Sequence, residues 1–393
     1  MHILNLSLRH FRNYEQLEFT PGPGVSLIYG NNASGKTSLL EALFYLATTR
    51  SPRTTNDREL VNWHAREEAV APPFARIAAD VQQVSGYIKI EVLIQLRSQE
   101  QHENSGGGSQ KLVRLNQRVV RALDLIGQLR VVLFTPDDLT LVDGAPSNRR
   151  RYLDMTLSQL DPHYVRTLSR YNKLVQTRNA MLRAWRERRR TLRSVDEELA
   201  YWDDEMITAG GYVLAERLQA VADVNTLIKP IFQANTGEAQ ELHIAYRPSF
   251  DFAGMTEAHH LVEQFRQTLQ QRRSEELKRG QTLVGPQRDD LLFTVGNVDL
   301  GRYGSRGQQR SVALALKLAE VELMRMRSGD APILLLDDVL SELDLQRRKY
   351  TLEAIRHPHQ QTIVSSTDLG TFDGDFLSAV DRWRVEQGRV YRG

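Results

Sequence analysis

An eight-residue segment near the N-terminus has the residue types of a phosphate-binding loop. It matches the pattern GxxxxGK[ST] completely and lies between a short apolar run and a helix-forming stretch. Its two glycines allow the backbone N–H groups to approach phosphate oxygens, and the N-terminus of the following helix adds positive potential. The predicted ATP-binding residues in this segment are Gly30, Asn31, Asn32, Ala33, Ser34, Gly35, Lys36 and Thr37.

The chemistry of such a loop assigns roles to its last two residues. Lys36 is expected to contact the β- and γ-phosphates, and the Thr37 hydroxyl to bind Mg²⁺. A second metal-binding group is needed at the end of a neighbouring strand, and the apolar run 333–336 ends in Asp337 and Asp338. We predict that Asp337 binds Mg²⁺ through water and that Asp338 acts as the general base or orients the attacking water.

A third segment, Tyr303 to Arg310, opens a helix about thirty residues before the acidic strand. Its Ser305, Gly307 and Gln308 are spaced as in the signature loop of ABC-type ATPases, which it resembles. In those folds the loop closes on the γ-phosphate held by a second protomer, with a helix N-terminus as the anion site. This resemblance implies that ATP joins two copies, and that Asp344, in the connecting loop after the acidic strand, carries information between the two sites.

The elements expected to position these residues belong to an α/β protein. Strands are predicted at 3–8, 17–19, 25–29, 74–81, 88–96, 112–115, 131–134, 291–295, 333–336 and 362–364, with a final hairpin around Gly388. The segment 105–109 is expected to be a flexible turn of a long hairpin. Helices are predicted from Lys36 and over 305–326.

The middle of the chain has a different pattern, with apolar residues spaced by three and four. It predicts amphipathic helices from Tyr164 to Trp185, from Leu199 to about Phe232 with a weak point at Gly210–Gly211, and from Glu257 to Leu277. Three helices without a sheet of their own favour an arm of antiparallel partners. The predicted division is therefore a first part of an ATPase head at 1–148, a helical arm or lobe at 149–280, and the second part of the head at 281–393.

The formal net charge of the 393 residues is +2, with 51 Lys and Arg against 49 Asp and Glu, but the charge is unevenly distributed. Residues 149–193 contain 13 basic and 3 acidic side chains, a net charge of +10. A helix with rows such as Arg166, Arg170 and Lys173 can bind the DNA backbone without reading sequence. The alternative is a solvated helix face that acidic residues around 196–205 partly neutralise, with 149–151 structural.

Composition excludes several classes of function. The 41% hydrophobic and 25% charged residues are typical of a globular protein, and no apolar stretch is long enough for a membrane span. The absence of cysteine excludes disulfides, thiol nucleophiles, Fe–S clusters, thiolate zinc sites and a cysteine zinc hook. These features favour a cytoplasmic, nucleoid-associated protein without a membrane partner.

Motifs spread over most of the chain resemble the RecF family, of the SMC/ABC type. They are His10–Tyr14, the loop continued through 38–42, 134–139, 144–151, 285–291, the sequence SRGQQR at 305–310 and LLLDDVLSELD at 334–344. The chain departs from the family at Gln287, where the family often has histidine, and in its glycine-rich hairpin. The resemblance implies a P-loop ABC/SMC-like head with an inserted helical, coiled-coil-like arm.

The function that this resemblance implies is ATP-dependent DNA binding in recombinational repair and replication restart. An ATP-bound homodimer would bind DNA near single-strand gaps or junctions and help to load RecA with RecR and RecO, which supports the SOS response. The enzyme would be a weak, DNA-stimulated ATPase that acts as a switch. Its hydrolysis would be slow because Asp338 stands where a longer glutamate is usual. The switch histidine of transporters is missing, and 364–367 offers hydroxyls instead.

Family membership also implies that Arg12 and Asn13 lie beside the nucleotide and that Asp137 or Asp138 takes the place of the glutamine lever of ABC proteins. Three alternatives stay open at this stage. The chain could be the nucleotide-binding subunit of a transporter, a non-catalytic adaptor that uses nucleotide only to fold, or a long-armed SMC-like protein. The separation of 301 positions from Lys36 to Asp337 disfavours the transporter subunit, and the short 149–280 insertion disfavours the long-armed SMC-like protein.

Overall fold

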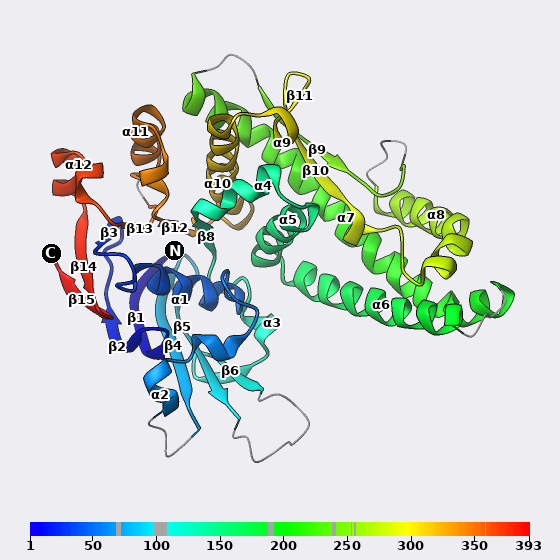
Figure 1. The fold of residues 1–393 in the computed structure, drawn as a ribbon, viewed down its shortest axis with the longest axis horizontal. Helices are drawn as coiled ribbons and strands as arrows, with labels where there is room; N and C mark the ends of the chain where they lie inside the picture. The colour runs from blue at the N-terminus through cyan, green and yellow to red at the C-terminus, as the bar shows by residue number, and fades with distance from the viewer. Residues whose placement is uncertain are drawn as a thin grey trace. The chain divides into compact units, whose positions relative to one another are not determined.

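The computed structural model describes residues 1–67, 72–97, 108–187, 192–237, 241–252, 254, 257–357 and 359–393, and for 192–195 it describes the backbone only. It contains two compact units (Figure 1). The head unit comprises Met1–Asp138, Ile231–Gly237 and Ala313–Gly393, and the arm unit comprises Leu139–Pro230 and Glu238–Val312. The predicted turn at 105–109 lies largely outside the described residues.

The first sheet of the head unit is mainly parallel. Its spatial order is β15 (Arg389–Arg392), β14 (Asp381–Glu386), β3 (Val25–Tyr29), β13 (Thr362–Ser366), β12 (Ile333–Asp337) and β8 (Val131–Phe134). Only the β14–β15 pair is antiparallel. The strands β3, β13, β12 and β8 are almost completely buried, as expected for parallel strands that read as continuous apolar runs. The sequence patterns predicted each of these strands to within two residues.

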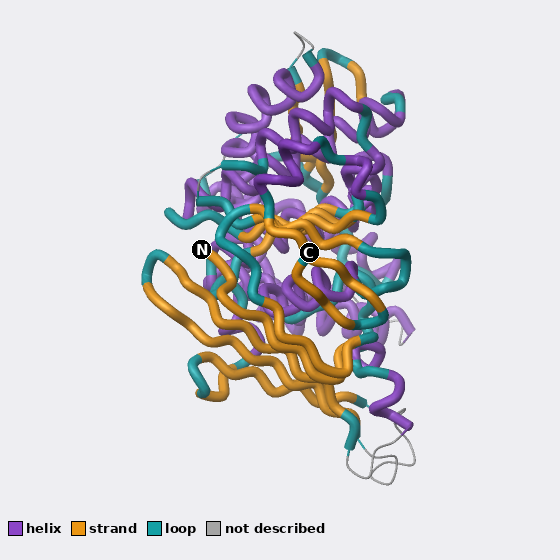
Figure 2. The backbone as a smooth tube through the Cα atoms, turned by 90° about the vertical axis from the view of Figure 1, so that its left-hand side faces the viewer, coloured by secondary structure: helices purple, strands orange, loops and turns teal. Residues whose placement is uncertain are grey.

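The second sheet of the head unit is antiparallel and alternates between buried and exposed residues. Figure 2 shows it as a curved layer of neighbouring strands. Its order is β2 (Tyr14–Phe19), β1 (His2–Phe11), β4 (Phe74–Gln83), β5 (Gly86–Leu96), β6 (Ser109–Leu115) and β7 (Arg118–Val120). Its solvent face carries ion pairs such as Arg76–Glu91 and Lys89–Asp80.

Helix α1 (Lys36–Thr48) lies between the two sheets, because it contacts β8, β12 and β13 of one and β4 and β5 of the other. Burial on both sides explains its nearly continuous apolar sequence from Leu39 to Ala47. Its N-terminus is consequently fixed at the end of β3. The other short helices of the head are η1 (Asp57–Leu60), α2 (Trp63–Glu67), α3 (Ala122–Leu125), η5 (Val339–Glu342), α11 (Leu345–Ala354), η6 (Leu369–Thr371) and α12 (Gly374–Ala379).

The arm unit is built mainly from long helices. Its elements are α4 (Thr140–Asp143), α5 (Pro146–Leu160), α6 (Pro162–Glu187), α7 (Leu192–Thr236, whose last turns belong to the head), β9 (Leu242–Arg247), α8 (Ala258–Arg279), η4 (Pro286–Arg288), β10 (Asp290–Val295), β11 (Val298–Asp299) and α9 (Leu300–Tyr303). Besides α7, two further elements cross the boundary between the units: η3 (Pro136–Leu139) and α10 (Arg306–Ser328). None of the described helices is both apolar and long enough to cross a membrane.

Helix α7 continues through Gly210–Gly211, which we expected to be a weak point. A Cβ at Gly210 would lie 2.7 Å from Phe265 and 2.8 Å from Tyr171, and one at Gly211 would lie 2.5 Å from Val262. The glycines therefore allow α7 to approach α6 and α8 closely. The tertiary contact outweighs the low helix propensity of glycine, which costs about 1 kcal/mol per residue.

The prediction of a helical arm without its own sheet is wrong. Strand β10 pairs with β9 over Asp290–Arg247 to Val295–Leu242, and β11 completes a three-stranded sheet in the arm unit. The short alternating segment LHIAYR between two helices carried the missed signal. The arm unit accordingly includes 139–148 and 281–312, which the predicted boundaries placed in the head.

Candidate nucleotide-binding site

The predicted phosphate loop connects β3 to α1, in the structural context that its sequence requires. Gly30 and Gly35 have φ angles of 154° and 123°, values that residues with a side chain rarely adopt. The Lys36 Nζ donates to the carbonyl oxygens of Gly30 at 2.7 Å and Asn31 at 2.9 Å. Burial lowers the pKa of Lys36, while Asp338 and Asp337 oppose this shift. The ammonium group therefore lies within the loop, with two carboxylates nearby.

The acidic end of β12 lies directly beside this loop. Thr37 Oγ1 donates to Asp337 Oδ1 at 3.1 Å, and Ser365 Oγ donates to the same oxygen at 2.7 Å. Ser365 is the register partner of Asp337 on β13, so the parallel pairing itself brings the two side chains together. A hydroxyl and a carboxylate at this separation suit Mg²⁺, which binds few protein oxygens and retains several waters. Thr37 and Asp337 thus fit the predicted metal role.

Asp338 leaves the strand in a left-handed conformation with φ 55°. Its N–H donates to the Ser365 hydroxyl at 3.1 Å, and this turn places both carboxylates in the wall of the same cleft. Asp338 Oδ1 is buried and has no hydrogen-bond partner among the described residues. Burial raises the pKa of Asp338, and Lys36 opposes that shift. An unpaired carboxylate oxygen near the lysine is suited to accept a proton from water.

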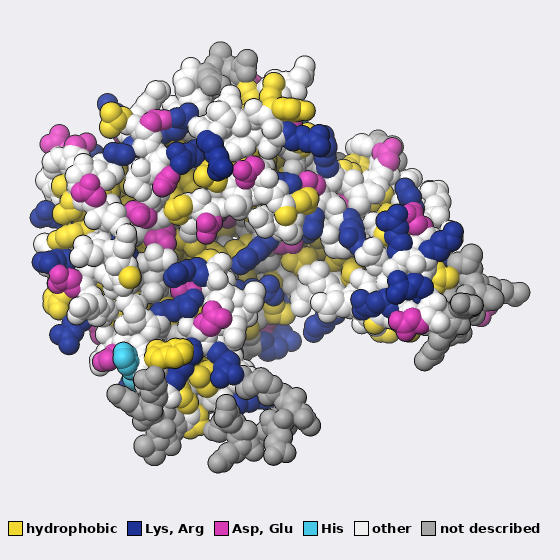
Figure 3. All heavy atoms as spheres, viewed as in Figure 1, with side chains coloured by type: hydrophobic (Ala, Val, Ile, Leu, Met, Phe, Trp, Pro, Cys, Tyr) yellow, Lys and Arg dark blue, Asp and Glu magenta, His cyan; other side chains and the backbone are white. Residues whose placement is uncertain are grey.

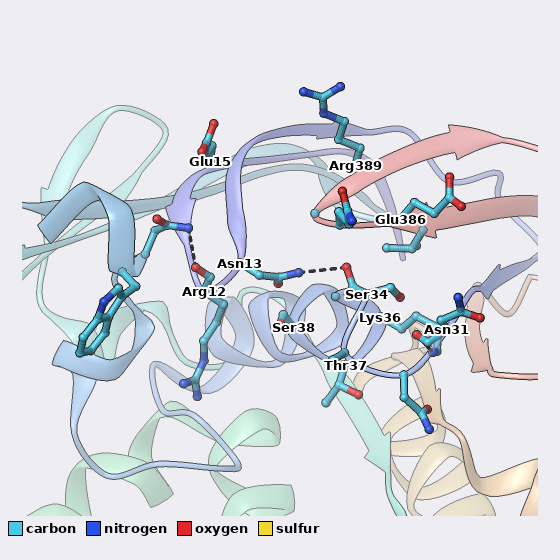
Figure 4. Close-up of a pocket in the computed structure, with 18 of the residues that line it drawn as sticks. Arg12, Asn13, Glu15, Asn31, Ser34, Lys36, Thr37, Ser38, Glu386 and Arg389 are labelled. Carbon is cyan, nitrogen blue, oxygen red and sulfur yellow. Dashed lines mark hydrogen bonds between the residues drawn. The ribbon is translucent and has the colours of Figure 1, made fainter. Parts of the chain in front are cut away.

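The turn between β1 and β2 supports the loop from one side. Asn13 Nδ2 donates to the Ser34 carbonyl at 2.9 Å (Figure 4). The buried Tyr14 hydroxyl donates to the Gly35 carbonyl at 3.0 Å. Tyr14 was not among the predicted site residues, although it lies in the quoted motif His10–Tyr14. The β1–β2 turn thus contacts the backbone of the phosphate loop.

Arg12 lines the cleft, but its guanidinium group is held by Glu41 of α1. Arg12 Nε and Nη2 donate to the two Glu41 oxygens at 2.9 and 2.7 Å, and Ser51 Oγ donates to Glu41 at 2.5 Å. A bidentate pair of this kind fixes orientation as well as charge. Glu41 and Ser51 do not line the cleft but hold Arg12 in place, a role that the sequence reasoning missed; Glu41 lies in the quoted extension of the loop.

The phosphate loop, the end of β12 and the β1–β2 turn line a cleft of about 1610 Å³ in the head unit (Figure 4). The cleft brings together the following predicted residues: Arg12, Asn13, Asn31, Asn32, Ala33, Ser34, Gly35, Lys36, Thr37, Asp337 and Asp338. Further residues of its wall include Arg53, Asn62, Trp63 and Tyr391. Asp344, the predicted link between two sites, is absent from the wall and instead caps α11 by accepting from the Arg347 N–H at 2.9 Å.

The signature residues lie at the start of α10, in the arm unit. Ser305 and Gln308 form a reciprocal cap, in which the Ser305 N–H donates to Gln308 Oε1 at 2.9 Å and the Gln308 N–H donates to Ser305 Oγ at 3.2 Å. Ser305 is exposed, and Gly307 follows it in the first turn. The helix N-terminus is therefore presented at the surface with a hydroxyl at its tip.

Comparison with known proteins agrees with this geometry. The family described as "RecF/RecN/SMC N terminal domain" matches residues 2–382. A relative from Chloroflexus aurantiacus, named DNA replication and repair protein RecF, is 59% identical over 393 residues, with full coverage of both chains. The chain belongs to the RecF family.

Solved structures agree with this assignment. The "Structure of the recombination mediator protein RecF-ATP in RecFOR pathway" has a TM-score of 0.86 and 27% identity, and covers 100% of this chain and 97% of that one. A crystal structure of an SmcHead bound to the C-winged helix domain of ScpA has a TM-score of 0.55 and 14% identity, with coverage of 100% and 97%. The second likeness concerns the fold alone. The fold is thus the α/β head of RecF and SMC proteins with an inserted arm, as predicted.

In this RecF-family chain neither Asp137 nor Asp138 lines the cleft. Asp138 accepts from the Thr135 N–H at 2.6 Å and pairs with the buried Lys317 of α10 at 3.2 Å. Asp138 thereby connects the segment after β8 to the signature helix within the head unit. The structure provides no support for either residue as a lever that touches nucleotide.

The basic segment of the RecF-family chain is only partly available for a ligand. Arg149 pairs with Asp290 at 2.6 Å, and Arg150 donates to the Asp289 carbonyl at 2.7 Å. Arg178 is fully buried between Asp203 and Glu276, at 2.7 and 2.6 Å. Arg178 is one of the 13 basic side chains counted in 149–193, but it is not available to DNA because it closes an ionic network between α6, α7 and α8.

The exposed cations of α6 remain as candidates for contact with DNA. They are Arg166, Arg170, Lys173, Arg183 and Arg186. Arg170 pairs with Glu205, and the Arg186 guanidinium donates to the Arg279 carbonyl. Figure 3 shows Lys and Arg side chains gathered over the arm. Arg188, Arg189 and Arg190 lie outside the described residues, as does the side chain of Arg193.

Proposed function

We propose that this RecF-family chain is an ATP-dependent DNA-binding protein of recombinational repair and replication restart. The observation that carries the proposal is the set formed by Lys36 inside its loop and the Thr37 hydroxyl 3.1 Å from Asp337. The related structure described as RecF-ATP supports ATP as the nucleotide. Mg²⁺, held by Thr37 and Asp337, would neutralise charge on the β- and γ-phosphates.

The residues of the chain have separate roles in hydrolysis under this proposal. The loop N–H groups and Lys36 bind the phosphates. Asp338, with its unpaired oxygen, orients a water for attack on the γ-phosphate and accepts its proton. Asp338 has a shorter side chain than glutamate, so hydrolysis is slow and works as a switch. DNA stimulates ATP hydrolysis by favouring the ATP-bound dimer.

ATP binding and dimerisation are coupled through the signature helix. The arm-unit residues Ser305, Gly307 and Gln308 would close on the γ-phosphate held by a second copy, where the helix N-terminus supplies an anion site. The exposed Ser305 hydroxyl, used as a cap in the single chain, supports this role. Asp344, exposed at the start of α11, would lie between the two sites. Hydrolysis then releases the dimer.

The arm supplies the DNA contact in this proposal. The exposed α6 cations would bind phosphates of gapped DNA or of a junction between single and double strands. The family resemblance adds RecR and RecO as partners in loading RecA at gaps, support of the SOS response, and a place in the cytoplasm at the nucleoid. RecF-family membership disfavours the transporter alternative.

The dimer is tested by sedimentation or small-angle scattering with ATP, ADP or no nucleotide, each with and without gapped DNA. We expect a dimer with ATP alone and a DNA-bound dimer when gapped DNA is added. A monomer under every condition would contradict the proposal. If ADP produced as much dimer as ATP, ATP would not be the specific signal for dimerisation.

Ser305→Asp is expected to prevent the ATP-dependent dimer while ATP still binds the monomer. Aspartate remains a good N-cap, so α10 keeps its start, but a carboxylate facing the γ-phosphate repels it. We expect the dimer dissociation constant to rise by about tenfold or more. Ser305→Thr, which keeps a neutral hydroxyl, serves as the control. If Ser305→Asp dimerises at the same ATP concentration as the wild type, the result would argue against the signature role of Ser305.

The double variant Lys173→Glu, Arg183→Glu tests the arm. Both residues are exposed on α6, and their reversal should weaken binding to DNA of any sequence. The plot of log affinity against log salt is expected to become shallower by about 0.9 for each DNA phosphate that the arm no longer neutralises. Lys89→Glu, on the solvent face of the antiparallel sheet, reverses one charge elsewhere and so makes half the charge change of the double variant. Equal affinity and slope for double variant and wild type would place the DNA surface on another part of the molecule.

A further inference from the structure

The C-terminal hairpin lies against the phosphate loop. Strand β14 pairs in parallel with β3, from Asp381 beside Ser26 to Arg384 beside Tyr29, and β3 leads directly into the loop. The hairpin turn consists of Gln387 and Gly388, with φ angles of 46° and 72°. Figure 4 shows Glu386 and Arg389, which flank this turn, on the side of the pocket where Asn13 and Ser34 lie.

Contact between the turn and the loop is made by backbone. The Gly388 N–H donates to the Ser34 carbonyl at 3.0 Å, and this oxygen also accepts from Asn13 Nδ2 at 2.9 Å. A Cβ at Gly388 would overlap the Asn13 carbonyl oxygen, and a Cβ at Gly30 would overlap the carbonyl oxygen of Val385 in β14. The hairpin, the β1–β2 turn and the loop therefore meet at positions where a side chain does not fit.

These contacts determine where the loop N–H groups point. The chain has no cis peptide among the described residues, and in a trans peptide the C=O and the following N–H point in opposite directions. Two donors hold the Ser34 carbonyl toward the hairpin and Asn13, so the Gly35 N–H points away from them. The Tyr14 hydroxyl holds the Gly35 carbonyl in the same way and so orients the Lys36 N–H. Both N–H groups are thereby prepared for an anion.

We propose that the C-terminal hairpin is part of the nucleotide site and that Gly388 is a positioning residue for the triphosphate of ATP. Through its N–H, Gly388 holds the Ser34–Gly35 peptide in the orientation that binds phosphate. The inference rests on the proposed function, because it takes the loop as the ATP site. It adds a contribution from the last strands of the chain, more than 350 residues after the loop.

Gly388→Ala is compared with Gly329→Ala. Both glycines are left-handed, with φ 72° and 69°, but a Cβ at Gly329 meets nothing within 4 Å. Titration with a fluorescent ATP analogue is expected to give a dissociation constant at least tenfold higher for Gly388→Ala and within twofold of wild type for Gly329→Ala. Tm is measured alongside. A lower Tm with unchanged affinity of folded Gly388→Ala would show a merely structural role and overturn the proposal.

Two further measurements complete the test. Inorganic tripolyphosphate, which lacks base and ribose, should lose affinity for Gly388→Ala by the same factor as ATP; unchanged affinity would overturn the loop-based explanation. Hydrogen exchange on the wild-type chain decides the question even where the variant does not fold: ATP should slow exchange of the Gly388 amide, and unchanged exchange would overturn the proposal. If wild type binds no ATP, the proposed function fails instead.

Discussion

Replacing Lys36 with alanine is expected to weaken ATP binding by on the order of a thousandfold. The lysine donates to two loop carbonyls at 2.7 and 2.9 Å, and with ATP bound it would donate to phosphate oxygens instead. Two charge-assisted hydrogen bonds, at about 1.5–3 kcal/mol each, account for a loss of this size. Calorimetric or fluorescence titration with ATP and Mg²⁺ measures it, and dimerisation and salt-sensitive DNA binding should be lost together with ATP.

Lys89→Ala is the matched control for Lys36→Ala. Lys89 makes an ion pair with Asp80 on the solvent face of the antiparallel sheet, and a surface pair of this kind contributes about 0–1 kcal/mol. We expect its ATP affinity to equal that of wild type. An affinity of Lys36→Ala within tenfold of wild type would exclude this loop as the main phosphate site.

Asp338→Asn is expected to slow ATP hydrolysis by about 10²–10⁴-fold while ATP still binds, because the amide keeps the shape but accepts no proton. The variant should therefore remain dimeric with ATP for longer than wild type. Single-turnover hydrolysis measures the loss, and scattering measures the dimer. Asp373→Asn, which keeps an N-cap on α12, is the control. If Asp338→Asn hydrolysed ATP at the wild-type rate, Asp338 would have no role in catalysis.

The pH dependence of this variant follows from the raised pKa of Asp338. The wild-type rate should fall as pH decreases through that pKa, because protonation removes the base, and the residual rate of Asp338→Asn should lack this limb. The raised pKa of Asp338 also affects the free energy of unfolding of the protein without nucleotide. The folded state favours the protonated carboxyl group, so the stability that this group contributes is lost as pH rises. The Tm difference, variant minus wild type, should therefore increase from pH 4 to pH 8 when measured with EDTA.

The local signals in the sequence were sufficient for the parts of the site that depend on neighbouring residues. The pattern from Gly30 to Thr37 needs close backbone approach and a helix start, and the structure has both. The apolar runs at 25–29, 131–134 and 333–336 predicted strands, and the structure places them in the parallel part of one sheet, where strands are buried on both faces. The carboxylates at the end of such a strand could lie only at the carboxyl edge of the sheet.

Sequence patterns could not predict contacts that depend on distant pairing. The hydrogen bond from Ser365 to Asp337 arises from the register of β13 beside β12. Hydroxyl residues are common in strands, so Ser365 alone did not indicate this contact. Arg178 belongs to a basic run, and only packing of three helices shows that it is buried with two carboxylates. The six-residue β9 was likewise overlooked, because its partner β10 follows more than forty residues later.

By itself the sequence determined the α/β class, the phosphate loop, the acidic strand end and the family, since these depend on residue types at short, regular spacings. Only the tertiary structure decided which charges are buried, where the arm unit begins, and that the last hairpin reaches the loop. The physical reason is that a buried ion pair or a backbone contact requires two segments to meet. Which segments meet is set by sheet register and helix packing across hundreds of residues, as Gly388 and Ser34 illustrate.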